Sequence, residues 1–267
     1  MPPRYHVITY GCQMNKNDSE RIEGLLDRIG FSAAPKPEDA ELILVNTCSV
    51  RQSAEDRVYG AMRNFARLKE KKPTLLLGVT GCMAGRDKDG AIRKRLPSVD
   101  FFFPIRDLPQ LPRWIAEARP ELANTADVEA DYLKILPARH ATRQAFVTIQ
   151  TGCNKFCSYC VVPFARGLER NRPVASIMEE LRSLSENGCV EVTLLGQTVN
   201  AYKAPDKDHF SPGNPYKDDF AALLWEVNQV QGIERIHFTA PHPIHMTDET
   251  IDALALPKHV NYLHLPV

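Results

Sequence analysis

Hydrophobic residues in the first hundred positions alternate between short continuous runs and longer stretches with helical spacing. The continuous runs are YHVITYGC (residues 5–12), AELILVNTC (40–48) and TLLLGVTGC (74–82). Between the first two runs, apolar side chains recur at the i, i+3, i+4 and i+7 positions of a helix, namely Ile22, Leu25, Leu26 and Ile29. A second helix is expected over residues 54–71. Apolar strands separated by helices are typical of a parallel sheet covered on both faces, so the pattern predicts a doubly wound α/β domain.

Each of these three runs ends in a cysteine, at Cys12, Cys48 and Cys82. Right-handed crossovers place the carboxyl ends of parallel strands at one edge of the sheet, which is where ligands bind in doubly wound folds. We therefore expect the three thiols to converge there. The helices that begin just after them would favour anionic thiolates. The alternative is that each is an ordinary cysteine buried in the core.

Four further apolar runs follow, AFVTIQTG (145–152), VEVTLLGQT (190–198), RIHFTAPHP (235–243) and VNYLHLPV (260–267). Amphipathic helical stretches separate them, at residues 174–188, 220–232 and 248–256. This repeating order is typical of a parallel (β/α) barrel, whose chemistry lies at the carboxyl ends of the strands. A closed barrel usually needs ~200 residues or more. Four strands therefore predict an incomplete barrel of about four βα units, in a chain truncated from a longer protein.

The stretch between the two patterns is rich in proline, in acidic residues and in small residues. Its prolines are Pro104, Pro109, Pro112, Pro120 and Pro137, and a short helix is expected over residues 114–118. Such a composition is typical of a linker between domains. The predicted organisation is an N-terminal α/β domain at 1–120, a linker at 121–138 and the incomplete barrel at 139–267.

Composition narrows the class of protein. Lys plus Arg and Asp plus Glu both number 33, so the net charge is zero and the overall charge gives no sign of a nucleic-acid binder. No apolar run approaches the ~18–20 residues of a membrane span, and the N-terminus lacks the features of a secretory signal. A cytoplasmic protein is expected. Seven cysteines, an odd number, then indicate metal binding or catalysis rather than disulfides.

The segment GCNKFCSYC (152–160) places Cys153, Cys157 and Cys160 in C-x3-C-x2-C spacing at the end of the first barrel strand. Four thiolates normally hold a four-iron cluster. Three would leave one iron open for a small molecule, much as a catalytic zinc keeps an open position. The alternative is a zinc site completed by a distant ligand, for which His140, His242 and His264 are candidates.

With Tyr159 before its last cysteine, this spacing resembles the signature of the radical S-adenosylmethionine enzymes. The resemblance implies that the open iron chelates the amino and carboxylate groups of S-adenosylmethionine, which is then cleaved reductively to a 5′-deoxyadenosyl radical. It also implies that Gly196 and Gln197 occupy the position of a glycine-rich motif that contacts the cofactor's amino group. A simple turn at the strand end is the alternative. His264 could approach the cofactor or serve as a core histidine.

Five segments together resemble the MiaB-type tRNA methylthiotransferases, in that family's order. They are YGCQMNKNDSE, NTCSVR, GVTGCMAG, GCNKFCSYCVVPFARG and LLGQTVNAY. The resemblance implies that Cys12, Cys48 and Cys82 hold a second [4Fe-4S] cluster. It implies a tRNA substrate carrying N6-isopentenyladenosine next to the anticodon, whose C2 gains a methylthio group. An electron donor and a monomeric state are also expected. The family's C-terminal β domain has no counterpart here, which agrees with a truncated chain.

Two other functions stay open. A sister branch methylthiolates an aspartate of a ribosomal protein, although "QMN" after Cys12 and "SVR" after Cys48 look like the tRNA branch. The second open function is that of a non-catalytic iron–sulfur module, such as an electron carrier. An electron carrier normally has four thiolates per cluster, which disagrees with three.

Positive charge gathers around the second cysteine group. Residues 139–172 contain six basic residues and one acidic residue, Glu169. The basic residues are Arg139, Arg143, Lys155, Arg166, Arg170 and Arg172. Such a patch could contact tRNA phosphates or the cofactor's carboxylate, and a solvated loop is the alternative.

Overall fold

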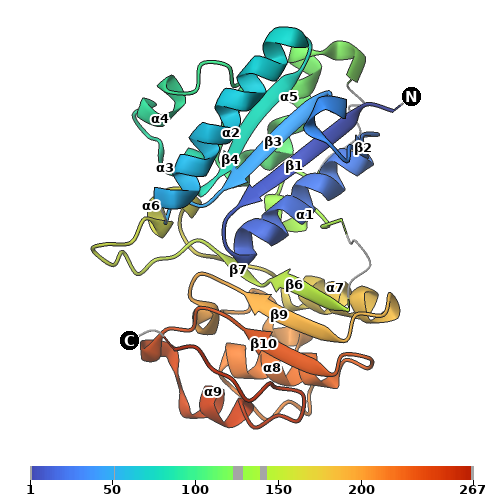
Figure 1. Cartoon of the computed structure of the whole chain (residues 1–267). Coiled ribbons are helices and arrows are strands. Elements are labelled where there is room, and N and C mark those ends of the chain that lie inside the picture. The colour runs from blue at the N-terminus through green and yellow to red at the C-terminus, as the bar shows by residue number, and fades with distance from the viewer. Residues whose placement is uncertain (1, 51, 123–128, 139–142, 266–267) are drawn as a thin grey trace. The chain divides into compact units, whose positions relative to one another are not determined.

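The computed structural model describes residues 2–50, 52–122, 129–138 and 143–265 (Figure 1). By its internal packing, the described chain divides into two compact units. Unit 1 comprises residues 1–139 together with 156–167, and unit 2 comprises 140–155 together with 168–267. The segment 156–167, which follows the first cysteine of the C-x3-C-x2-C motif, therefore packs with the N-terminal half of the chain. The predicted division at residue 120 stays a prediction.

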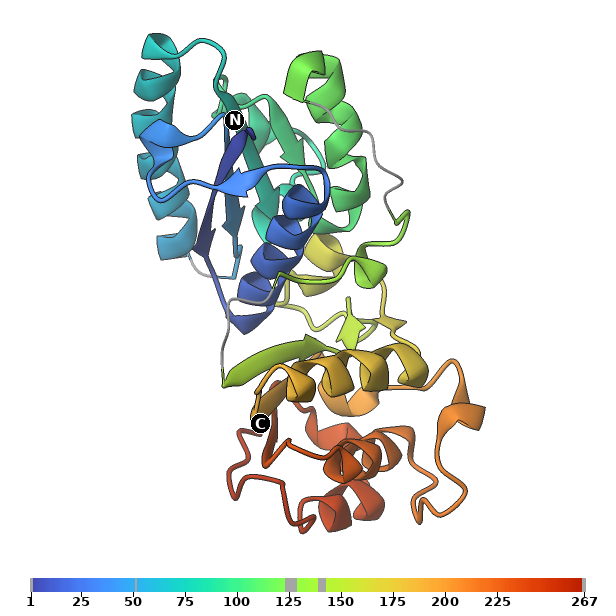
Figure 2. The ribbon, with the colours of Figure 1, turned by 90° about the vertical axis from the view of Figure 1, so that its right-hand side faces the viewer.

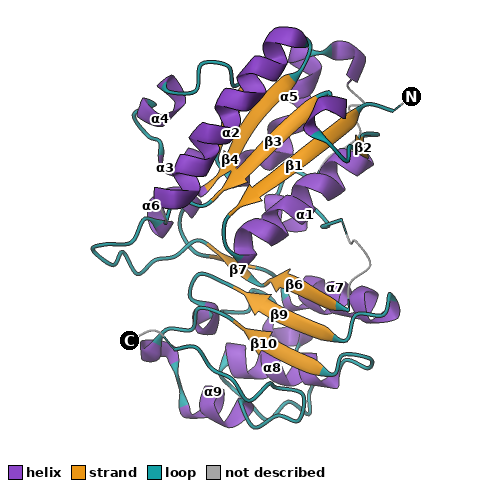
Figure 3. Ribbon diagram, in the orientation of Figure 1, coloured by secondary structure: helices purple, strands orange, loops and turns teal. Residues whose placement is uncertain are grey.

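Unit 1 is built on a parallel sheet, which in the described residues has the strand order β2-β1-β3-β4-β5 (Figure 3). Its strands are β1 (Arg4–Tyr10), β2 (Ser32–Ala33), β3 (Leu42–Thr47), β4 (Leu76–Gly81) and β5 (Phe101–Phe103). The three long strands coincide with the three apolar runs, as predicted. The short strands β2 and β5 extend the sheet at its two edges and were not predicted.

Helices cover both faces of this sheet, which makes unit 1 doubly wound. They are α1 (Gln13–Arg28), α2 (Gln52–Lys71), α3 (Cys82–Arg86), α4 (Ala91–Lys94), α5 (Leu111–Ala118) and α6 (Val162–Arg166). Figure 2 shows α2 on one side of the strands and α1 with α5 on the other. A separate hydrophobic core lies on each side: Leu25 and Ile115 belong to the first, and Val58 and Met62 to the second. Strands β3 and β4 are buried along their whole length, which explains their near-continuous apolar runs.

Part of the predicted linker is core. Tyr132, Leu133 and Ile135 are buried among the apolar side chains under α1 and α5. The buried guanidinium of Arg21 donates to the backbone carbonyls of Leu133, at 3.4 Å, and of Ile135. These apolar residues lie between prolines and acidic residues. The composition of the segment therefore predicts a linker and gives no sign that these side chains are buried.

Unit 2 contains a parallel sheet with the order β10-β9-β6 in its described part, consistent with a partial (β/α) barrel. Its strands are β6 (Gln144–Thr148), β9 (Glu191–Leu195) and β10 (Arg235–Phe238), and its helices are α7 (Val174–Glu186), α8 (Asp219–Gln229) and α9 (Asp248–Ala253). Their apolar faces share one core, in which the rings of Phe220 and Phe238 meet edge to face at 5.1 Å. The predicted order of strands and helices is confirmed for these elements.

The expected fourth strand, at residues 260–267, does not form a ladder in its described part. Next to it, His259 makes an isolated parallel bridge with Ile236 of β10, and Val260 donates to the Ile236 carbonyl at 3.0 Å. The amide of Tyr262 then donates a hydrogen bond to the Val260 carbonyl at 2.7 Å, which forms a tight turn. This tight turn ends the pairing, so the prediction of a regular fourth strand was wrong for residues 260–265.

Burial of His259 makes the stability of unit 2 depend on pH. Both ring nitrogens of His259 lack a hydrogen-bond partner within the described residues. Burial lowers the pKa of His259, and the neighbouring His237 lowers it further. Since the unfolded chain binds this proton more readily, stability is complete above the unfolded pKa of ~6.5 and falls below it. We expect unit 2 to lose at most about 0.8 kcal/mol through His259 between pH 8 and pH 6.

Urea unfolding followed by Trp225 fluorescence in a Trp114→Phe background would measure this loss, because Trp225 lies on α8 of unit 2. His259→Phe should reduce the pH dependence, part of which stays because burial also lowers the pKa of His237. His264→Gln, which changes an exposed histidine, should leave it unchanged. Equal pH dependence in the parent and in His259→Phe would contradict the assignment.

Candidate metal centres at the cysteine groups

The three N-terminal cysteines lie at one edge of the unit 1 sheet. Tyr10, Thr47 and Gly81 are Cα partners across the adjacent strands β1, β3 and β4. Cys48 and Cys82 directly follow the last residues of β3 and β4, and Cys12 comes two residues after the end of β1. The amide of Cys48 donates to the Tyr10 carbonyl at 2.8 Å, which ties two of these strand ends together. The predicted common edge is confirmed, and we name these cysteines the N-terminal triad.

Each member of the triad is next to the start of a helix. Helix α1 begins at Gln13 and α3 at Cys82 itself, while α2 begins at Gln52, shortly after Cys48. Helix N-termini favour negative charge, so they would stabilise thiolates at this edge. The Cys48 sulfur also accepts a hydrogen bond from the amide of Val50 at 3.3 Å. Backbone donors of this kind are suited to sulfur that carries negative charge.

Two of the triad thiols are buried and the third is exposed. Cys48 and Cys82 are 6% and 5% exposed, and Cys12 faces solvent. Burial raises the pKa of the Cys82 thiol; the Arg166 guanidinium opposes this, while Asp18 and Cys48 add to it. Cys48 and Cys82 directly follow the paired residues Thr47 and Gly81, so the two buried thiols lie at adjacent strand ends.

A side-chain network holds the start of α1 against β3. Both the amide and the thiol of Cys12 donate to the Asn15 side-chain oxygen, at 3.3 and 3.4 Å. The Asn15 amide group in turn donates to the Asn46 oxygen at 3.2 Å, and Asn46 donates back to the Asn15 carbonyl at 2.8 Å. Asn46 also bonds Ser19 at 3.0 Å. The sequence analysis did not identify Asn46. A polar residue inside an otherwise apolar strand could have indicated it, because a buried polar side chain needs hydrogen-bond partners.

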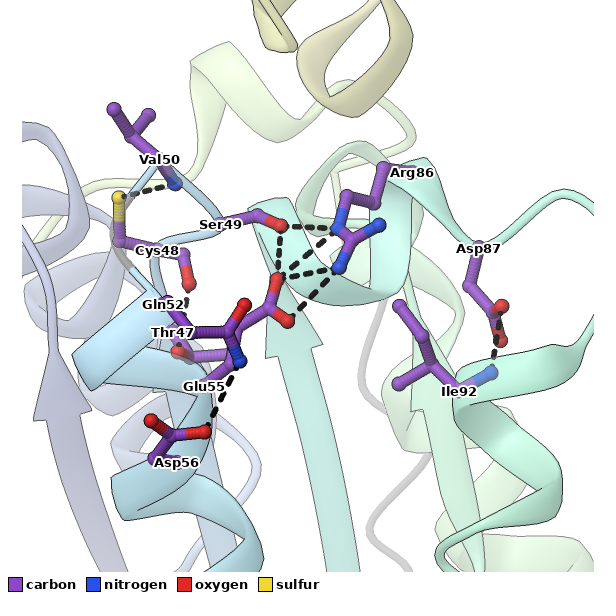
Figure 4. Close-up of polar contacts among 10 residues, drawn as sticks. All are labelled: Thr47, Cys48, Ser49, Val50, Gln52, Glu55, Asp56, Arg86, Asp87 and Ile92. Carbon is purple, nitrogen blue, oxygen red and sulfur yellow. Dashed lines mark hydrogen bonds and ion pairs between the residues drawn. The ribbon is translucent and has the colours of Figure 1, made fainter.

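A second network joins the backbone after Cys48 to the helix that begins at Cys82 (Figure 4). Glu55 of α2 is 4% exposed and accepts from Arg86 at the end of α3, at 2.7 and 2.8 Å. Ser49 donates to the same carboxylate at 2.5 Å and accepts from Arg86. Because a paired charge and its partners fix each other's positions, this network holds the Cys48 and Cys82 strand ends in register. It too was missed, because Glu55 and Arg86 look like surface residues in the sequence.

The second cysteine group lies on a loop whose ends are held by a short antiparallel pair. Strands β7 (Gln150–Thr151) and β8 (Arg170–Asn171) pair on either side of it, and Gln150 donates to Asn171 at 3.1 Å. This pair was not predicted from the sequence. It lies in unit 2 and brings the two ends of the loop together, so the loop begins and ends at the carboxyl edge of β6.

Cys153 is buried in unit 2, with 7% of its surface exposed. Its sulfur accepts from the amide of Lys155 at 3.4 Å and lies 3.4 Å from the Thr198 hydroxyl. Cys157 and Cys160 belong to unit 1 and are partly exposed, in a turn where the Cys160 amide donates to the Cys157 carbonyl at 2.9 Å. All six cysteines are free thiols and therefore available as ligands.

The described residues hold no group of three or more His, Cys, Asp or Glu side chains arranged for a single metal ion. That finding concerns single-ion sites, whereas the thiolates of an iron–sulfur cluster bind different irons. The ligand roles of the six cysteines stay a prediction.

Comparison with known proteins matches both halves of the chain. Residues 4–104 match the model described as "Uncharacterized protein family UPF0004", and residues 147–267 match the radical SAM superfamily. Two relatives are proteins named tRNA-2-methylthio-N(6)-dimethylallyladenosine synthase. The one from Photobacterium profundum is 42% identical over all of this chain and 56% of its own length. The one from Syntrophomonas wolfei is 43% identical over all of this chain and 59% of its own.

The chain belongs to the MiaB-type methylthiotransferase family of the radical S-adenosylmethionine superfamily.

The chain spans between half and two thirds of the length of these methylthiotransferase relatives. In fold it is similar to a solved radical S-adenosylmethionine methyltransferase, TsrM from Kitasatospora setae, with a TM-score of 0.60 and 13% identity. That match covers 96% of this chain and 57% of TsrM. The likeness supports the fold class of an N-terminal doubly wound domain followed by a partial radical-SAM barrel.

The predicted cofactor contacts have clear positions in the structure. Tyr159 is 92% exposed on the cysteine loop. Gly196 follows β9, and a Cβ there would lie 2.9 Å from Val199 Cα and 3.1 Å from the Gln150 side-chain oxygen. Tight packing thus explains the glycine without a ligand, and the cofactor roles of Tyr159, Gly196 and Gln197 stay predictions.

Of the histidines named as candidate zinc ligands, His242 and His264 form no hydrogen bond with a cysteine among the described residues. His242 begins a 3-10 turn and accepts from the Ile244 amide at 3.2 Å. His264 is exposed in irregular backbone. His140 lies outside the described residues. The seventh cysteine, Cys189, is 2% exposed and bonds the Glu191 carbonyl at 3.2 Å, as expected for a core residue.

The basic patch is smaller than the sequence predicts. Arg166 is buried in an ion pair with Asp18 at 2.5 Å, and Arg172 is buried with Glu180 at 2.6 Å. These two cations therefore cannot reach phosphates on the surface. Arg143, Lys155 and Arg170 stay accessible, and Arg139 lies outside the described residues. None of the described helices has both the length and the apolar character that a membrane crossing requires.

Proposed function

We propose that this chain supplies the catalytic part of a tRNA methylthiotransferase. Its parent protein would add a methylthio group to C2 of N6-isopentenyladenosine next to the anticodon. The observation that carries the proposal is the common sheet edge shared by Cys12, Cys48 and Cys82, on three hydrogen-bonded strands. A second thiol triad, on a loop at the end of the first barrel strand, completes the pattern.

The donor atoms fit two [4Fe-4S] clusters. The N-terminal triad would hold one, and Cys153, Cys157 and Cys160 would hold the other. Thiolates are the ligands these clusters require, and amide donors already point at the sulfurs of Cys48 and Cys153. Three thiolates per cluster leave one iron of each cluster without a protein ligand. In the cluster held by Cys153, Cys157 and Cys160, S-adenosylmethionine would bind at that iron.

The chain's own residues have three roles in this proposal. The clusters, when bound and reduced, supply the electron transfer that cleaves S-adenosylmethionine and the sulfur chemistry. The networks around Asn15 and Glu55 fix the strand ends that carry the triad. Tyr159, Gly196 and Gln197 would contact the cofactor. Arg143, Lys155 and Arg170 would meet phosphates of the tRNA.

Three features of the setting belong to the same proposal. An external electron donor reduces the cluster, the protein acts as a monomer, and it works in the cytoplasm, where tRNA is found. The names of the relatives favour tRNA over a ribosomal protein as the substrate.

The function is tested by anaerobic reconstitution of the chain, reduction with dithionite and addition of S-adenosylmethionine. We expect 5′-deoxyadenosine and methionine to form, and Cys157→Ala to abolish their formation. Cys189→Ala is the matched control, because it changes a buried cysteine outside both triads. A reconstituted chain that binds iron without cleaving the cofactor would favour the non-catalytic module instead.

The substrate is tested with the full-length parent protein. Mass analysis of tRNA from a strain without its gene should show N6-isopentenyladenosine without the methylthio group, restored by the wild-type gene. Unchanged tRNA, with loss of methylthiolation on a ribosomal protein, would assign the parent to the sister branch.

A further inference from the structure

Arg166 is buried in unit 1, although in sequence it comes just after the radical-SAM cysteine motif. It ends the short helix α6, which packs closely against α3. The approach is so close that a Cβ built on Gly85 of α3 would overlap the backbone of Ala165. The segment that carries Cys157 and Cys160 is therefore attached to the helix that begins at Cys82.

The guanidinium of Arg166 is held in place by Asp18 of α1. Its two terminal nitrogens reach the two carboxylate oxygens, at 2.5 and 3.4 Å. The side chains are 2% and 0% exposed. Tyr132 donates its hydroxyl to the same carboxylate. A buried forked pair with a third partner has little freedom, so the direction in which Arg166 presents its charge is fixed.

Arg166 also lies within hydrogen-bond reach of the Cys82 thiol, at the start of the helix against which α6 packs. Its buried ion pair with Asp18 compensates for the loss of hydration, and a guanidinium stays protonated in proteins, so Arg166 is cationic. The position thus combines a permanent cation, a hydrogen-bond donor and a low dielectric beside one triad sulfur.

We propose that Arg166 is a positioning residue of the N-terminal cluster, which sets the reduction potential of that cluster through the Cys82 sulfur. This rests on the proposed function, in which the N-terminal triad holds a [4Fe-4S] cluster. Net charge and hydrogen bonds to cluster sulfurs are the terms by which a protein tunes such potentials. A nearby cation stabilises the more negative reduced state, and Asp18 partly offsets that cation. Arg166 therefore raises the reduction potential of the cluster and Asp18 lowers it, and both act near the Cys82 sulfur.

The test isolates the N-terminal cluster in the full chain with Cys153, Cys157 and Cys160 all changed to Ala. Its midpoint potential is then measured by a redox titration followed by electron paramagnetic resonance, with iron content as a second readout. Arg166→Gln should shift the potential to more negative values, because a cation and a donor are removed. Asp18→Asn should shift it to more positive values, because the cation is no longer offset. The double variant should fall between the two.

Opposite signs are the feature that a merely structural role would not produce. The matched control is Arg172→Gln with Glu180→Gln, which removes an equally buried ion pair in unit 2 and should leave the potential unchanged. If Arg166→Gln fails to fold, the positive shift in Asp18→Asn carries the test alone. Shifts of the same sign in both single variants, or no shift in Asp18→Asn, would overturn the proposal. Failure of the parent background to take up iron would instead refute the proposed function.

Discussion

Cys48→Ala is expected to remove about half of the iron that the chain binds on anaerobic reconstitution. Two four-iron clusters correspond to about eight irons per chain, and each triad would account for about four. Cys48 is the central member of its triad, because β3 lies between β1 and β4 in the sheet. Two thiolates on the outer strands would be too few to hold the cluster. Cys157→Ala should remove the other half, and a variant with both changes should bind almost none.

Iron and acid-labile sulfide, measured per chain, give the result directly. Cys189→Ala should keep all of the iron, because this buried cysteine lies in the core of unit 2. Loss of all the iron in Cys48→Ala alone would show that the two triads do not bind independently. Tightly bound zinc in place of iron would exclude the cluster assignment.

Gly81→Ala is expected to destabilise unit 1 by roughly 2–6 kcal/mol. Gly81 ends β4 just before Cys82 and has φ +97°, in the left-handed region that favours glycine. An added Cβ would lie 2.5 Å from the Thr47 carbonyl oxygen and 2.5 Å from the Asn46 side-chain oxygen. The substitution thus combines backbone strain with overlap against β3. Since Asn46 also holds the start of α1, iron uptake by the N-terminal triad should fall as well.

Two other glycines separate these contributions. Gly30→Ala keeps the strain, with φ +91°, but its Cβ would meet nothing within 4 Å, so a loss of roughly 1–2 kcal/mol is expected. Gly60→Ala, in the interior of α2 with open space around it, should be stabilising by about 0.5–1 kcal/mol. Urea unfolding followed by Trp114 in a Trp225→Phe background reports on unit 1, where Trp114 packs on Phe103. An equal loss in Gly81→Ala and Gly30→Ala would exclude the overlap with β3.

The strands and helices that position the site could be predicted because their own residues determine them. The runs ending at Cys48 and Cys82 are strongly apolar over their length, and buried parallel strands have that pattern. Strand β5 was missed because Phe101–Phe103 is too short to show a period. The last predicted strand failed because pairing depends on the backbone turn at Tyr262, which the apolar pattern of that segment does not reveal.

The candidate site was predicted at its cysteines and missed at the residues around them. Cysteines mark their chemistry by type and spacing, whereas Glu55, Arg86 and Arg166 are charged residues of kinds that usually lie on the surface. Only the fold brings their partners within reach. Arg166 and Asp18 are far apart in sequence, and nothing local to either one indicates that it is buried. The same limitation made the basic patch look larger in the sequence than it is.

The packing of α6 against α3 has a practical consequence for dissecting this protein. Sequence patterns suggest a clean cut between the two halves, near residue 139. A fragment cut there would lack Arg166, and the carboxylate of Asp18 would be left in an apolar interior without its cation. The N-terminal half therefore depends for its own integrity on a short peptide that the gene encodes later, after the barrel has begun. Truncation studies that separate the two clusters should change ligands one by one rather than divide the polypeptide.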